Sequence, residues 1–122
     1  MYRRRFERLV GRALRQLPLE IREQMDNVAV VVEDEPTPAQ RAAADLPPGD
    51  TLLGLYQGIP LTQRTAGYGM VLPDKVTIFR KPIEAICSSD QQIVRQIRQT
   101  VIHEIAHHFG LSEDDLRRLH RS

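Results

Sequence analysis

The amino-acid sequence predicts an α+β fold in which a helix opens the chain, a small mixed sheet of three or four strands follows, and two helices close it. Three observations support this prediction. Apolar residues recur at helical spacing between Phe6 and Leu17. A β-branched run extends from Val28 to Val32, and a second helical pattern with an apolar side ends at Phe109. Helices at both ends with strands between them favour one domain.

The N-terminal part of the chain is predicted to form two helices and one strand. The first helix covers residues 6–17 and ends before Pro18, because proline lacks a backbone N–H and cannot continue a helix. A short helix is expected from Glu20 to Met25. The run Val28 to Val32 lies between polar residues and Pro36, which is typical of a buried strand. We expect that strand at the centre of the sheet.

The middle of the chain is predicted from its prolines and its alternating residues. Residues 36–50 hold four of the eight prolines, which predicts a loop or a loop with a helical turn. Thr51 to Gln57 is the second predicted strand. Lys75 to Arg80 is the third, with Pro73 and Pro82 marking its ends.

A long helix is predicted near the C-terminus. It is expected to begin at Ser88 or Ser89, because each serine is followed three positions later by a glutamine in the capping-box pattern. It should run to Phe109, after which Gly110 can take the left-handed conformation that ends a helix. A short terminal helix follows, with Ser112 as its N-cap and acidic residues in its first turn.

Length and composition agree with a single domain over residues 1–122. The chain has 41% hydrophobic and 27% charged residues, and no apolar run approaches the ~20 residues that span a bilayer. The N-terminal segment MYRRRFER is not followed by the hydrophobic stretch of a secretory signal, so a cytoplasmic location without a membrane partner is expected. Cys87 is the single cysteine, which excludes an internal disulfide and a cysteine-based metal site.

Residues 103–110 read HEIAHHFG and place two histidines four residues apart. On an α-helix such residues differ by about 40° around the axis, so His103 and His107 project from one face and can bind one ion. Zinc is the expected metal, because imidazoles suit it and a catalytic zinc keeps three protein ligands. Glu104 lies about 100° from His103, which places its carboxylate to act as a general base toward water.

The third metal ligand is expected in the acidic turn that follows Gly110. Glu113 stands ten residues after His103, the offset of the third ligand in the motif that extends HExxH through a glycine, and it is the first choice. Asp114 is the alternative. Asp115 suits helix capping better, since all three acids also fit the first turn of a plain helix.

Other side chains are candidates for roles around the metal. His108 lies about one helical turn from Glu104, so we expect it to line the cleft or orient a substrate as a second catalytic residue. Tyr68 is flanked by two glycines and could belong to a flap over the site. His120 has no partner at ligand spacing, and it is not assigned to the metal.

The sequence resembles a known group, the small bacterial zincin-like proteins that are described as predicted metallopeptidases with a minimal zincin fold. The resemblance covers nearly the whole chain and is most specific at residues 100–111; the other matching segments are 6–18, 27–36, 53–61 and 72–74. It implies His103 and His107 as zinc ligands and Glu104 as the catalytic glutamate. The third ligand of that family is usually an aspartate at the position that Glu113 occupies here.

The resemblance implies a zinc-dependent metallopeptidase that hydrolyses a peptide or an unfolded protein with metal-activated water and a glutamate general base. Glutamate is one methylene longer than the usual aspartate, so either Glu113 or Asp114 can be the third ligand. In zincins the strand beside the motif helix commonly offers its edge to an extended peptide, and by resemblance that strand is Lys75 to Arg80. No oligomeric state is predicted.

Two other classes of function are alternatives to a zinc-dependent metallopeptidase. Arg4, Arg8 and Arg12 share one face of the first helix and could contact the phosphates of a nucleic acid. However, the chain has 17 basic and 16 acidic residues and only 5% aromatic residues, so a solvated helix face is favoured over a nucleic-acid partner. Glu104 also argues against a metal-dependent nucleic-acid hydrolase. A non-catalytic zincin-like binding module is the third class, because it would keep the same ligands.

Overall fold

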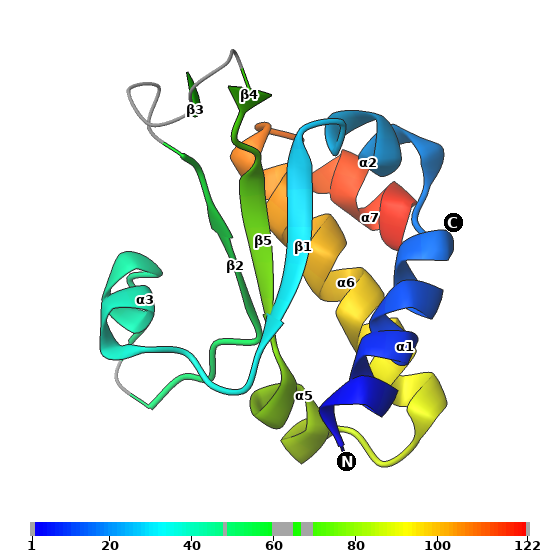
Figure 1. Cartoon of the computed structure of the whole chain (residues 1–122). Helices are drawn as coiled ribbons and strands as arrows, with labels where there is room; N and C mark the ends of the chain where they lie inside the picture. The colour runs from blue at the N-terminus through cyan, green and yellow to red at the C-terminus, as the bar shows by residue number, and fades with distance from the viewer. Residues whose placement is uncertain (1, 48, 60–64, 67–69, 122) are drawn as a thin grey trace.

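The computed structural model describes residues 2–47, 49–59, 65–66 and 70–121 of the chain (Figure 1). Helices lie at both ends of the chain and the strands lie between them, which confirms the predicted α+β class. The elements are α1 (Arg3–Arg15), α2 (Leu19–Gln24), β1 (Val28–Glu33), α3 (Pro38–Ala43), β2 (Gly54–Gln57), β3 (Thr65–Ala66), β4 (Met70–Val71), β5 (Asp74–Phe79), α5 (Arg80–Ile86), α6 (Asp90–His108) and α7 (Glu113–Arg121). No helix in the described ranges has the length and apolar character needed to cross a bilayer.

The main sheet has three strands in the order β1-β5-β2, with β5 parallel to β1 and antiparallel to β2. The prediction that Val28 to Val32 forms the central strand is therefore wrong, because β5 holds that place. The burial of the side chains agrees: Val76 and Ile78 of β5 are fully buried, whereas most of β1 is half-buried. A β-branched run fits a strand with one covered face as well as a central strand. Strands β3 and β4 form a separate two-stranded sheet.

Helix α6 is the centre of the hydrophobic core. It packs against β2 and β5 on one face of the sheet, and α1 and α7 pack on α6 (Figure 1). Its buried residues meet Phe6 of α1, Ile78 of β5 and Leu119 of α7 in one cluster. On the other face, Leu52, Leu55 and Phe79 form a smaller cluster against the segment that follows α3. The motif helix is thus fixed along one side and open along the other.

Capping interactions set both ends of α6. The Ser89 hydroxyl accepts a hydrogen bond from the Gln92 backbone N–H at 3.1 Å, which confirms the predicted start of the helix. At the other end Gly110 has a φ of +71°, and the Leu111 N–H donates to the Ala106 carbonyl at 2.9 Å. This Schellman arrangement confirms the predicted helix stop and turns the chain sharply into α7.

Of the two short helices beside the sheet, α3 agrees with the sequence prediction and α5 does not. Helix α3 lies within the proline-rich segment and begins with a capping box between Thr37 and Gln40, so the helical turn that was one of the two expectations is present. Helix α5 was not predicted. It begins at Arg80, directly after β5, and Pro82 occupies its first turn, where a missing N–H costs nothing.

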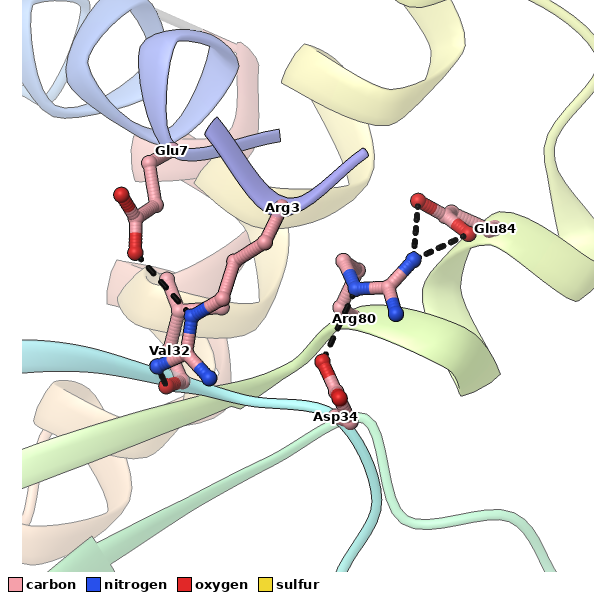
Figure 2. Close-up of polar contacts among 6 residues, drawn as sticks. All are labelled: Arg3, Glu7, Val32, Asp34, Arg80 and Glu84. Atoms are coloured by element: carbon pink, nitrogen blue, oxygen red, sulfur yellow. Dashed lines mark hydrogen bonds and ion pairs between the residues drawn. The ribbon is translucent and has the colours of Figure 1, made fainter. Parts of the chain in front are cut away.

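Two arginines tie the helices to the end of β1. The Arg80 guanidinium lies between Asp34 at 3.0 Å and Glu84 at 3.2 Å (Figure 2). The hydrogen bond from Arg80 holds the pKa of Asp34 below its usual value. Arg3 donates to the Val32 carbonyl and pairs with Glu7 (Figure 2). Arg3 of the first helix therefore has a structural role.

Candidate metal centre and catalytic groove

The two motif histidines lie side by side on the exposed face of α6. The ring centroids of His103 and His107 are 6.2 Å apart and the ring planes are inclined at 39°. Both side chains are exposed, while Ile102, Ile105 and Ala106 on the opposite side of the helix are fully buried. The separation is close to what two imidazoles need to bind one ion at about 2.1 Å from each nitrogen. The helix therefore presents two donors that fit zinc.

The third ligand is not assembled with this pair. Within the described residues, no three His, Cys, Asp or Glu side chains gather closely enough to hold a metal ion. Glu113 and Asp114 begin α7, and both are exposed. Asp114 pairs with Arg117, whereas the Glu113 carboxylate has no hydrogen bond or ion pair to any residue that the structure describes. Glu113 is thus the acid that can move without breaking a contact.

Asp115 serves the helix rather than the metal. Its backbone N–H donates to the Ser112 hydroxyl at 3.1 Å, and its carboxylate accepts a hydrogen bond from the Ser112 N–H at 3.3 Å. These hydrogen bonds from Ser112 lower the pKa of Asp115. The reciprocal pair is a capping box, which confirms both Ser112 as N-cap and Asp115 as a capping residue.

The carboxylate of Glu104 is held by the edge of the sheet. Its Oε1 accepts a hydrogen bond from the Tyr56 backbone N–H at 3.0 Å. In the antiparallel pair β2-β5, Leu53 and Leu55 point their backbone groups toward β5, so the N–H of Tyr56 points outward. Glu104 is half-buried between this strand and the two histidines. An outward-facing amide of the edge strand β2 therefore orients the predicted base.

His108 packs against the same strand. Its ring stacks on Tyr56 with centroids 3.8 Å apart and planes inclined at 15°, and Phe109 meets both rings edge-on. The Tyr56 hydroxyl donates to the buried carboxylate of Asp74 at 2.6 Å, which fixes the stacking partner. The structure thus places His108 in the wall of the groove. Tyr68 lies outside the described residues.

A groove follows α6 on both sides of Glu104. A cavity of about 550 Å³ is lined by Tyr56, His103, Glu104, His107 and His108, together with residues 43–55 in part. A second cavity of about 530 Å³ continues toward the start of α6, and it shares His103 and Glu104 with the first. The two predicted histidine ligands and the predicted base therefore line adjoining cavities between α6, β2 and the segment after α3, whereas Glu113 and Asp114 line neither.

His120 belongs to this groove, although no local pattern in the sequence places it there. It lines the 530 Å³ cavity together with His103, and its Nδ1 is buried with no hydrogen-bond partner in the described part of the chain. Burial lowers the pKa of His120, and the charges of Arg98 and His103 act in the same direction. Because α7 folds back along α6, a residue far beyond the motif in the chain returns to the side of His103.

Gly54 sets how closely α6 approaches the edge strand. A Cβ added at Gly54 would lie 2.5 Å from Thr100 Cγ2 and 3.1 Å from the Thr77 carbonyl oxygen. We expect Gly54→Ala to lower the free energy of unfolding by about 1–3 kcal/mol, as overpacking of a tight contact usually does. Urea unfolding followed by circular dichroism would measure the change.

Two further variants test this explanation. Thr100→Ser removes the Cγ2 methyl and keeps the hydroxyl that donates to the Gln96 carbonyl, so the double variant should regain part of the lost stability. Gly58→Ala is the matched control, since the nearest described atoms to a Cβ there belong to Asp74 and lie at 3.8 Å or more. A loss of equal size at Gly58, or no recovery in the double variant, would contradict a steric cause.

Comparison with known proteins adds a fold relative and a family. A conserved hypothetical protein from T. thermophilus is similar in structure, with a TM-score of 0.55 and 21% identity over 89% of this chain and 94% of that chain. At that identity the similarity shows the fold alone. No curated protein matches the chain. The model of the zincin-like metallopeptidase family matches residues 25–122, which include all of the groove residues named above. The chain belongs to the zincin-like metallopeptidase family.

Proposed function

We propose that this protein is a zinc-dependent peptidase that cleaves extended segments of peptides or unfolded proteins. His103 and His107 hold the metal, Glu113 completes the ligand set, and Glu104 is the general base. The single observation that supports this proposal best is the hydrogen bond from the Tyr56 N–H to Glu104. It ties the proposed base to the edge strand β2 in the groove that His103 and His107 also line.

The edge beside α6 is β2, and not the Lys75 to Arg80 segment that was expected to bind the substrate. That segment forms β5, which pairs on both sides and has no free edge. The backbone groups of Gly54 face outward on this edge of β2, and an extended peptide can pair with such groups as an added strand. The Tyr56 N–H is not part of this pairing, because it donates to Glu104. Pairing through the backbone recognises few side chains, so an unfolded segment of varied sequence suits this site.

The chemistry assigned to the groove is hydrolysis of an amide bond. Zinc, when bound, supplies Lewis acidity that lowers the pKa of water toward ~7 and polarises the carbonyl group. Glu104 takes a proton from the attacking water and returns one to the amide nitrogen as the C–N bond breaks. The Tyr56 amide keeps the Glu104 carboxylate oriented. His108, which stacks on the Tyr56 ring, provides a polar group in the wall of the groove near the scissile bond.

The test is a cleavage assay with two classes of substrate. The purified chain, loaded with one equivalent of zinc, is incubated with an unstructured protein such as β-casein and, separately, with an unstructured RNA. We expect peptide products by mass spectrometry, no products after zinc is removed with a chelator, and intact RNA. Degraded RNA with intact protein would assign the site to a nucleic-acid hydrolase. Bound zinc with neither substrate cleaved would assign it to a binding module.

A further inference from the structure

The groove does not end at the 530 Å³ cavity. A third cavity, of about 470 Å³, adjoins it and shares Gln99 and His120 as lining residues. Its other lining residues come from α1 and α6 and the residue that follows α1: Arg12, Gln16, Gln91, Val94, Arg95 and Arg98. Gln99 and His120 therefore line both cavities, and a ligand over the histidine pair that passes these two side chains reaches a recess between α1 and α6.

A row of side chains on α6 links this recess to the metal pair. Arg95, Gln99, His103 and His107 are spaced by four residues on α6, and each step of four moves about 6 Å along the helix. Arg95 thus lies about 12 Å from His103 along the axis. An extended peptide covers about 3.3 Å per residue, so about three to four residues bridge the two positions.

The recess carries positive charge without a balancing acid. Three arginines and no aspartate or glutamate are among its lining residues. Arg12 and Arg95 have no ion pair within the described residues, in contrast to Arg5 of the same first helix, which binds Asp90 at 2.7 Å. Both side chains are exposed and available to a ligand. Guanidinium groups that face one recess favour a carboxylate, which accepts charge-assisted hydrogen bonds from both.

The guanidinium of Arg98 links three chain segments beside the recess. It donates to the Gln16 carbonyl at 3.1 Å and to the Leu119 carbonyl at 3.3 Å, which links α1, α6 and α7 around the cavity. Arg12 and Arg95 are therefore carried by helices that are joined at this point, and they do not depend on a flexible loop. Both arginines thus line a single recess between helices that Arg98 links.

We infer that Arg12 and Arg95 form an anion subsite that selects peptides with a carboxylate about three or four residues from the scissile bond. This inference rests on the proposed peptidase function for the position of the bond, but not for the binding of the carboxylate. The carboxylate belongs either to an acidic side chain or to the C-terminus of the peptide. Either source reaches the recess along the Gln99 side of α6.

The first experiment measures binding, so that its result does not depend on catalysis. Fluorescence anisotropy of labelled nine-residue peptides is recorded with the metal-free chain in about 50 mM salt. The first peptide has one internal glutamate and an amidated C-terminus, the second has glutamine and a free C-terminus, and the third has glutamine and an amidated C-terminus. We expect at least one of the first two to bind about tenfold more tightly than the third, and to lose this advantage in 0.5 M salt.

Two double variants test whether the preference for a carboxylate arises at the recess. Arg12→Gln with Arg95→Gln should abolish the tenfold difference while leaving the affinity for the neutral peptide within twofold. The matched control is Arg4→Gln with Arg22→Gln, which removes the same charge from exposed positions that do not line the recess. The control should keep the full difference. If the two double variants behave alike, the preference reflects overall charge and the inference fails.

Cleavage mapping separates this inference from the proposed function. With the zinc-loaded chain, peptides that move the glutamate one residue at a time should be cut three or four residues from it. Cleavage at sites that do not depend on the position of the glutamate would support the peptidase function and contradict the subsite. Absence of all cleavage, together with the tenfold binding preference, would contradict the peptidase function and support the subsite. Equal binding of all three peptides, or tighter binding of an oligouridine that the Arg12 and Arg95 changes abolish, would overturn the subsite.

Discussion

Replacement of Glu104 by glutamine is expected to lower the rate of peptide hydrolysis by about 10²- to 10⁴-fold, the range over which a general acid–base group contributes. The glutamine side chain has the same shape, and its carbonyl oxygen can still accept the hydrogen bond from the Tyr56 N–H. Only the basicity is lost. Initial rates on a fluorogenic peptide, measured with equal zinc content in both proteins, would give the ratio.

A second substitution at Glu104 separates the effect of the position of the carboxylate from the effect of its basicity. Glu104→Asp keeps a carboxylate but shortens the side chain, so the contact with the Tyr56 amide is lost and the base is withdrawn from the groove. We expect an intermediate rate for this variant and the lowest rate for Glu104→Gln. A Glu104→Gln rate within threefold of wild type would show that another group activates water.

The motif helix could be predicted from the sequence because its determinants are local. A serine that caps the first turn, two histidines at a spacing of four and a glycine that permits a left-handed residue are all read within a few positions of each other. Ser89 and Gly110 accordingly mark the two ends of α6 where they were expected. The same holds for Ser112 and Asp115, since a capping box is a contact between residues three apart.

The order of the strands could not be predicted in this way. Strands β1 and β5 pair although a long stretch of chain separates them, and their order depends on how the helices cover the sheet. The valine-rich segment Val28 to Val32 is more hydrophobic than Lys75 to Arg80, yet it lies at an edge. Its own composition fits an edge strand with one face on the core, and the choice between the two positions is made by tertiary packing.

The contacts that organise the groove have no signature in the sequence either. Tyr56 orients Glu104 through a backbone N–H, and a backbone group is the same at every residue except proline. His120 and Arg12 reach the groove because α7 and α1 pack along α6, and both lie far from the motif in the chain. Local patterns thus identified the candidate reacting groups, while the fold identified the residues that position them.

Replacement of His107 by alanine is expected to abolish binding of the one zinc ion per chain that we propose. One of the two imidazoles that lie together on α6 is lost, and only His103 and the Glu113 carboxylate remain as proposed ligands. Since loss of an outer-shell partner already costs about 10- to 100-fold in metal affinity, loss of a direct ligand should cost on the order of 10³-fold or more. Competition with a chromophoric chelator would measure the affinity, and zinc-dependent thermal stabilisation would be lost in parallel.

The neighbouring histidine provides the matched control, and the same titration identifies the third ligand. His108→Ala removes an imidazole that stacks on Tyr56, so zinc affinity should stay within about tenfold of wild type, as for an outer-shell change. Glu113→Gln should weaken zinc far more than Asp114→Asn, because Asp114 is paired with Arg117 and Glu113 is not paired within the described residues. If His107→Ala still bound one zinc at wild-type affinity, the metal would lie elsewhere, and the roles of His103 and Glu104 in hydrolysis would fall with it.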